Sequence, residues 1–151
     1  MLAINMSAER KQIEAELKKY CIPILRILGF KGSFPNLYRD VEGFVSLINF
    51  QFYSSGGSFC INLSYAEPDR ANVYYRKETE PKNLKVSQTT EHIRLGAERK
   101  GDDKWFSFGK TNYAEYRGKP ISILDLVSSI NILIKTQAEE WWANKREQTK
   151  S

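Results

Sequence analysis

The chain has 151 residues, of which 41% are hydrophobic and 13% aromatic, and its formal net charge is +5 at pH 7. This length fits a single domain over residues 1–151, and the apolar content excludes a disordered protein. No apolar run approaches the roughly 18–20 residues of a membrane span, and the first residues lack the pattern of a secretory signal. We therefore expect a cytoplasmic protein, starting at Met1 or Met6.

A first helix is predicted after Ser7, a residue type favoured at helix N-caps. Apolar residues then recur three or four positions apart and define one helix face: Ile13, Leu17, Cys21, Ile24 and Leu28. Pro23 predicts a kink or a restart within this segment. Gly29 is typical of the residue after a helix, and Phe30 can fold back onto that helix.

A hairpin is predicted to be the centre of the fold. Residues 33–39, weakened by Pro35, form a short first strand, and a turn at 40–43 leads into a long strand over 44–53. Gly56 and Gly57 then supply the positive φ of a hairpin turn. Centred there, the turn pairs Ile48 with Tyr65, Phe50 with Leu63 and Phe52 with Ile61 on an apolar face.

The other face of this hairpin is polar and nearly uncharged. Its predicted pairs are Asn49 with Ser64, Gln51 with Asn62, and Tyr53 with Cys60. A plain solvated sheet surface accounts for such a face. The alternative is a recognition surface, because amides both donate and accept hydrogen bonds.

Further strands are predicted at 73–77, 89–97 and 105–108. Ile93, Leu95, Ala97, Phe106 and Phe108 would face the helices. His92, Arg94 and Trp105 would face the other way.

A C-terminal helix begins at Ser122, with Asp125 in the spacing of a capping box. Its main apolar stripe is Ile123, Val127, Ile130, Ile134 and Ala138, widened by Leu124, Leu126 and Leu133. Trp141 and Trp142 lie about 100° apart around the helix and cannot both face the core. One of these two tryptophans could therefore support a homodimer.

The order of helix, antiparallel strands and helix predicts an α+β fold. We expect a two-layer sandwich, with a sheet of about four to six strands and both helices on one face. The opposite face would carry Asn49, Gln51, Asn62, Ser64, His92, Arg94 and Trp105.

Several short blocks resemble a bacterial family of domains of unknown function, DUF4304. They are Gly29-Phe30-Lys31, Ile48-Asn49-Phe50-Gln51, Phe59-Cys60-Ile61-Asn62-Leu63, His92-Ile93-Arg94-Leu95-Gly96 and Asp103-Lys104-Trp105-Phe106. Phe106 departs from the family pattern, in which two tryptophans are more frequent. The resemblance covers Ile13 to Phe108, and the C-terminal helix less clearly. It implies a standalone cytoplasmic domain without an established activity, and it singles out Gln51, Asn62, Arg94 and Trp105.

The sequence offers little catalytic chemistry. His92 and Glu91 are adjacent and point to opposite faces of a strand, so adjacency does not make them a dyad. Cys21 and Cys60 lack metal-ligand spacing and are expected to be free thiols. The Gly-Gly segment joins two strands, whereas a phosphate loop leads into a helix. We expect no metal and no cofactor, which leaves only an unrecognised enzyme site around Gln51, His92 and Arg94.

Two binding hypotheses follow. Under the first, the protein is non-enzymatic and holds a protein partner on the polar face, through Asn49, Gln51, Asn62, His92, Arg94 and Trp105. An immunity-type protein that neutralises a toxin would be one form, by analogy of size and fold. Under the second, residues 70–119 bind nucleic acid. They carry twelve basic and seven acidic residues, hence all of the +5, and interleave bases with aromatic residues. No membrane partner is expected.

Overall fold

The computed structural model describes residues 2–54, 57–74, 79–108 and 122–150. Its strands are β1 (Lys31–Ser33), β2 (Asn36–Val41), β3 (Phe44–Phe52), β4 (Ser58–Ala66), β5 (His92–Arg94) and β6 (Phe106–Ser107). Its helices are α1 (Leu2–Tyr20), α2 (Ile22–Ile27), α4 (Ile123–Leu133), η4 (Ile134–Ala138) and α5 (Glu139–Thr149). Two short 3-10 turns, η2 (Pro81–Asn83) and η3 (Val86–Gln88), precede β5.

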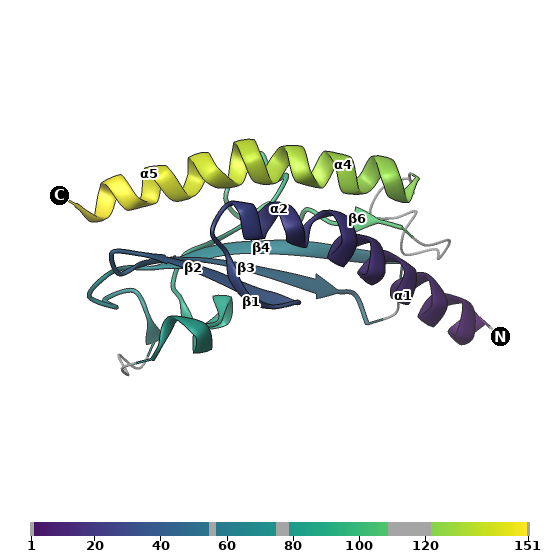
Figure 1. Cartoon of the computed structure of the whole chain (residues 1–151), viewed down its shortest axis with the longest axis horizontal. Helices are drawn as coiled ribbons and strands as arrows, with labels where there is room; N and C mark the ends of the chain where they lie inside the picture. The colour runs from purple at the N-terminus through teal and green to yellow at the C-terminus, as the bar shows by residue number, and fades with distance from the viewer. Residues whose placement is uncertain (1, 55–56, 75–78, 109–121, 151) are drawn as a thin grey trace.

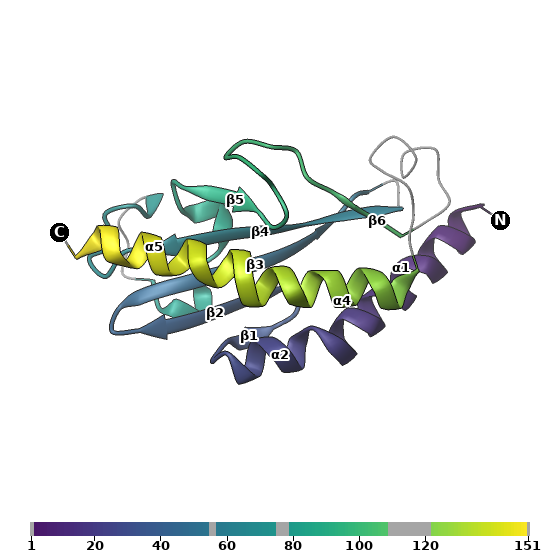
Figure 2. The same cartoon turned by 90° about the horizontal axis from the view of Figure 1, so that it is seen from above.

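The described strands form one antiparallel sheet in the order β1-β2-β3-β4-β5, with β6 also pairing with β4. All of the long helices lie over one face of this sheet, whereas η2 and η3 lie against the other face (Figure 1). From above, α4 and α5 run along the sheet, with α1 and α2 beside them (Figure 2). The predicted α+β sandwich, with both helices on one face, is therefore confirmed.

The N-terminal segment folds as two helices because of Pro23. α1 ends at Tyr20 and α2 begins at Ile22, so that the proline stands in the first turn of α2, where its missing N–H costs nothing. Beyond Pro23 the buried position is Leu25 and not Ile24. α1 begins at Leu2, and the prediction of an N-cap at Ser7 was therefore wrong.

The end of α2 is a Schellman motif. Gly29 has a φ of +97°, and its N–H donates to the Arg26 carbonyl at 3.0 Å. The Phe30 N–H donates to the Leu25 carbonyl at 2.9 Å, and the Phe30 ring is buried. The predicted roles of Gly29 and Phe30 are confirmed.

The predicted first strand is divided at Phe34-Pro35 into β1 and β2, which pair with each other. The proline lies in the connection, since it has no N–H to donate to a ladder. β2 and β3 are then joined by a two-residue turn in which Glu42 and Gly43 both have positive φ, as a primed hairpin turn requires.

The pairing predicted for the β3–β4 hairpin was wrong by two residues. Ile48 faces Leu63, Phe50 faces Ile61, and Phe52 faces Phe59. The Tyr53 N–H donates to the Ser58 carbonyl at 2.9 Å, so the connection spans residues 54–57 and is not a two-residue turn at Gly56-Gly57. A shift of two leaves every side chain on its predicted face, which is why the apolar pattern did not detect it.

The remaining predicted strands are shorter than expected. Residues 89–97 contribute only His92–Arg94, and 105–108 only Phe106–Ser107. In place of the strand predicted at 73–77, Val73 forms a single bridge with Thr89, and residues 75–77 lie outside the described part of the chain. The side chains of Leu95, Ala97 and Phe106 are buried, and Ile93 and Phe108 pack against the main core.

A second, smaller core lies on the outer sheet face. It contains Val45, Leu47, Ala66, Val73, Leu84 and Val86, with Tyr38 packed against them. The segment that carries η2 and η3 therefore shields one end of this face. The polar face expected to be open is open only at its other end.

The C-terminal helix begins as predicted, because the Ser122 hydroxyl accepts the Asp125 N–H at 3.2 Å. The side chains of Ile130, Ile134, Ala138 and Trp142 are at most 1% exposed. These residues are four apart, and in a regular α-helix such a stripe drifts by about 40° per step. The π-helical turn η4 accommodates an extra residue and limits the drift. Leu124 is 62% exposed, contrary to prediction.

The two tryptophans differ as expected. Trp142 is buried, and its indole N–H donates to the Ser64 carbonyl at 2.8 Å. Trp141 is half-buried, with its ring edge-on to Tyr65 at 5.8 Å between centroids. Of the pair suggested for a homodimer, Trp142 is therefore taken up by the core. Across the described helices, we find none with both the length and the apolar composition needed to cross a bilayer.

Candidate functional site

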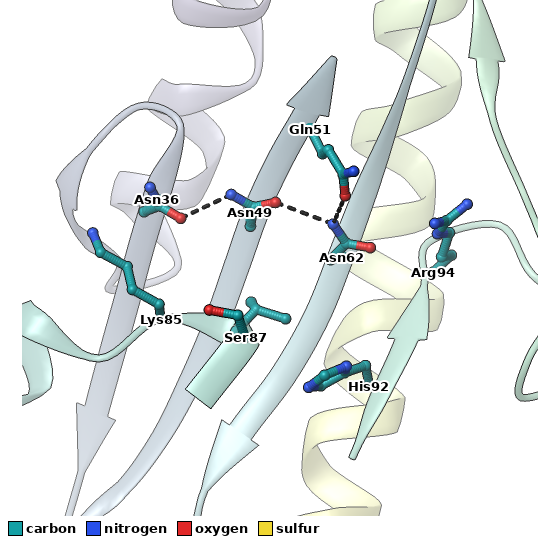
Figure 3. Close-up of a pocket in the computed structure, with 9 residues that line it drawn as sticks. Asn36, Asn49, Gln51, Asn62, Lys85, Ser87, His92 and Arg94 are labelled. Atoms are coloured by element: carbon teal, nitrogen blue, oxygen red, sulfur yellow. Dashed lines mark hydrogen bonds between the residues drawn. The ribbon is translucent and has the colours of Figure 1, made fainter. Parts of the chain in front are cut away.

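A row of amide side chains crosses the open end of the outer sheet face. Asn36 on β2 pairs with Asn49 on β3, Asn49 pairs with Asn62 on β4, and Asn62 pairs with Arg94 on β5. The row follows from the strand register, because directly opposed residues share a face. Figure 3 shows the three asparagines side by side, with Gln51 above Asn62.

Hydrogen bonds join these amides into a continuous network. Asn49 Nδ2 donates to Asn36 Oδ1 at 2.8 Å, and Asn62 Nδ2 donates to Asn49 Oδ1 at 3.0 Å. Asn62 Nδ2 also donates to Gln51 Oε1 at 3.0 Å. The Cys60 thiol, on the same face of β4 as Asn62, lies 3.7 Å from Gln51 Oε1 and 3.8 Å from Asn62 Oδ1. Each amide therefore fixes the orientation of the next.

The amides form the floor of a pocket of about 420 Å³. Its lining is Asn36, Asn49, Gln51, Asn62, Lys85, Val86, Ser87, His92 and Arg94. Lys85 and Ser87 come from the η3 segment, and His92 and Arg94 from β5. The pocket thus forms where the second core ends and the amide row begins.

His92 is oriented by its own loop. Its Nε2 lies 2.7 Å from the Thr89 carbonyl oxygen, and because a carbonyl only accepts, Nε2 carries the hydrogen. In Figure 3 the ring extends from β5 beside the amide row.

Arg94 is held in place by two neighbours. Its guanidinium is paired with the carboxylate of Asp103 and lies over the Trp105 ring, 4.9 Å from the centroid. The Trp105 indole N–H donates to the same carboxylate at 2.6 Å. Asp103 thereby fixes both side chains, and it lines a neighbouring hollow together with Asp102 and Gly101.

Five of the six predicted site residues line this one pocket: Asn49, Gln51, Asn62, His92 and Arg94. Trp105 does not. It is 9% exposed and packs edge-on against Tyr53, with 5.9 Å between the ring centroids, and Arg94 covers its face. The sequence reasoning missed Asn36, Lys85 and Ser87. Asn36 was detectable as a third amide on the neighbouring strand, but the approach of η3 had no periodic signal.

The pocket brings Gln51, His92 and Arg94 together, as the enzyme hypothesis requires. In the described lining, however, there is no carboxylate, and the hydrogen bond of His92 is to a main-chain carbonyl. A base oriented by a carboxylate and aimed at a nucleophile is not formed by these residues. Within the described ranges, no three His, Cys, Asp or Glu side chains gather where a metal ion could bind.

In the described part of residues 70–119, several of the basic side chains are engaged within the chain. Arg70 donates to the Gly43 and Glu67 carbonyls at 3.0 Å, and Lys82 pairs with Glu80 at 3.4 Å. Lys100 lies 3.8 Å from Glu91. Tyr75, Arg76, Lys77, Lys110, Tyr113, Tyr116 and Arg117 lie outside the described residues.

Fold and site together define a small α+β protein whose helices cover one sheet face and whose other face carries an amide-lined pocket. The family model for the domain of unknown function DUF4304 matches residues 21–144, and the chain belongs to this family. The match extends into the C-terminal helix as far as Asn144, further than the expected limit at Phe108, and it begins at residue 21, after α1, and not at Ile13. No curated protein and no solved structure matches the chain.

Proposed function

We propose that this is a non-enzymatic binding protein that holds a protein partner on the open end of its outer sheet face. The observation that carries the proposal is the amide row of Asn36, Asn49 and Asn62, which is fixed across three paired strands and lines a pocket. A rigid row of polar groups loses little conformational entropy on binding, which favours recognition. A toxin neutralised by an immunity-type protein would be one such partner.

The pocket residues also carry suitable anchors. Arg94 is pre-positioned by Asp103 and Trp105, and ordered arginines are frequent energetic anchors in protein interfaces. Its side chain is 25% exposed, so part of it is available to a partner. An open pocket on a sheet face suits a projecting side chain or loop better than a small molecule, which is commonly enclosed on most of its surface.

The test is co-purification from the native host with tagged variants. In the pocket variant, Asn36→Ala is combined with Gln51→Ala, both at positions whose side chains reach solvent. The matched control combines Gln12→Ala with Lys135→Ala, which are exposed on the helical layer. We expect wild type and control to retain the same protein and the pocket variant to lose it, with all three proteins folded and showing cooperative thermal melts. Retention by a folded pocket variant would refute the proposal.

Trp105→Ala is unsuitable for this test. The Trp105 side chain is buried against Tyr53 and Arg94, and truncating a buried tryptophan costs about 3–5 kcal/mol of stability. If this variant lost the partner, the loss would reflect unfolding and not a missing contact in the interface.

A further inference from the structure

The hydrogen bonds within the amide row engage its oxygens and leave several of its N–H hydrogens without a partner among the described residues. The oxygens of Asn36, Asn49 and Gln51 each accept a bond from within the row, and the Asn62 oxygen lies against the Cys60 thiol. Each amide nitrogen has two hydrogens. Asn62 uses both of its hydrogens, Asn49 uses one, and Asn36 and Gln51 use none on an acceptor among the described residues. The floor of the pocket therefore offers amide hydrogens that have no partner among the described residues, whereas each of its amide oxygens already has one lone pair engaged or contacts the Cys60 thiol.

The charged residues at the rim of the pocket also favour an anionic ligand. Lys85 and Arg94 stand at opposite sides of the row (Figure 3), and in the described lining no acid accompanies them. Asp103 neutralises part of Arg94 from the neighbouring hollow, whereas Lys85 has an exposed side chain. Both cations belong to residues 70–119, the segment that holds the whole net charge of the chain.

We propose that the partner enters this pocket with an acidic segment, whose carboxylates lie between Lys85 and Arg94. These carboxylates accept hydrogen bonds from the side-chain N–H groups of Asn36, Asn49 and Gln51. This rests on the proposed function and specifies the chemistry of the partner. Charged acceptors form the stronger hydrogen bonds with amide and cationic donors, and opposite charges raise the rate of encounter.

Nucleic acid also presents anionic oxygens, but the pocket favours a protein. Single-stranded nucleic acids are held by bases stacked on aromatic rings. Among the described lining residues there is no Phe, Tyr or Trp, and the nearby Trp105 is already covered by Arg94. A pocket of about 420 Å³ accommodates a few acidic side chains.

The experiment is a titration of the isotope-labelled full chain, followed by the NMR signals of the side-chain amide groups. The probes are a short oligoglutamate peptide, a glycine–serine peptide of equal length and an oligothymidylate. We expect oligoglutamate, and not the neutral peptide, to shift the Asn36, Asn49 and Gln51 amide signals, with weaker binding at high salt. Lys85→Gln combined with Arg94→Gln should weaken this binding about tenfold or more. Lys135→Gln, which removes an exposed charge from the helical layer, should leave it unchanged.

Lys85→Gln alone keeps the test valid if Arg94→Gln disturbs the pairing with Asp103, because the Lys85 side chain is exposed. Absence of shifts at these three amides with oligoglutamate would overturn the inference. Tighter binding of oligothymidylate at the same signals would overturn it in favour of nucleic acid. Either result leaves the proposed function to its own test, because co-purification that depends on Asn36 and Gln51 does not require an acidic partner.

Discussion

Arg39 on β2 and Glu139 on α5 form a two-pronged ion pair, with Nη2–Oε1 and Nη1–Oε2 distances of 2.8 and 3.0 Å. The same guanidinium lies 4.6 Å from the Phe30 ring centroid and 5.3 Å from that of Trp142, and it donates to the Leu28 carbonyl at 3.1 Å. One side chain thus joins the end of α2, the sheet and the C-terminal helix. Arg39 is 16% exposed, so this pair is only weakly screened by water.

Replacing Arg39 by methionine should therefore lower the free energy of unfolding by about 2 kcal/mol, because it leaves Glu139 and the Leu28 carbonyl without their donor. Lys150→Ala, which removes an exposed pair with Glu147, should change it by less than about 0.5 kcal/mol. Urea unfolding followed by tryptophan fluorescence measures both. Equal effects of the two substitutions would contradict the role given to Arg39.

Glu91 should make stability depend on acid pH. Burial raises the pKa of its carboxyl, but hydrogen bonds from Lys145 at 2.6 Å and from the Tyr65 hydroxyl at 2.9 Å, with the nearby charges of Lys145 and Lys100, bring the pKa below the ordinary 4.5. A lowered folded-state pKa stabilises the protein above the unfolded pKa, and this contribution is lost as the pH falls through the folded one.

Glu91→Gln should consequently melt at a lower temperature than wild type at pH 7, and the difference should shrink as the pH falls below 4.5. Thermal melts across this range provide the measurement. Glu147→Gln, an exposed carboxyl near Lys150, serves as the control. Parallel curves for wild type and Glu91→Gln would exclude this contribution.

The pairing of β3 with β4 can be tested by double-mutant cycles. Asn49 and Asn62 are opposed and hydrogen-bonded, so Asn49→Ala and Asn62→Ala should show a coupling of about 0.5–1 kcal/mol. Ser64 is opposed to Leu47, so Asn49→Ala and Ser64→Ala should couple far less. A reversed order of the two couplings would support the alternative pairing, displaced by two residues.

Gln137 positions the loop that follows β5. Its Oε1 accepts the Gly96 N–H at 2.6 Å, and its Nε2 donates to the Ala97 carbonyl at 2.7 Å. Gln137→Ala should destabilise the protein by about 1–3 kcal/mol, because two partly buried main-chain groups lose their partners. It should also speed hydrogen exchange at Gly96. Gln12→Ala, exposed on α1, is the control; unchanged exchange at Gly96 would show that this clamp is unimportant.

The sequence was sufficient to predict which side chains share a face of the sheet, but not which residues are paired across neighbouring strands. Alternation placed Ile48, Phe50, Ile61 and Leu63 toward the helices correctly, because side-chain direction has a period of two. A period of two does not change when one strand is displaced by two residues, so the pairing of Asn49 with Asn62 could not be predicted from it. The residues of β3 and β4 that face each other depend on the length of the connection between the two strands.

The pocket was predictable only in part for a related reason. Asn49, Gln51 and Asn62 belong to regular strands, whose pattern is visible in one dimension. Lys85 and Ser87 reach the pocket on η3, which is held by the contacts of Leu84 and Val86 with the second core. Such irregular segments have no repeat from which their position could be inferred. Val45 and Leu47, apolar on the otherwise polar face, were the one available sign that something covers them.

The π-helical turn Ile134–Ala138 keeps the two halves of the C-terminal helix in phase, although the chain there is one residue longer than a regular α-helix needs. Deleting one residue there, such as Lys135, would leave the buried residues Ile130, Ile134, Ala138 and Trp142 spaced by four, three and four, which keeps them on one face of a continuous α-helix. Trp142 would then still reach the Ser64 carbonyl, and Glu139 would still reach Arg39. Making the turn α-helical without removing a residue would instead rotate everything beyond it by about 100°, so we expect relatives either to keep this turn or to be one residue shorter here.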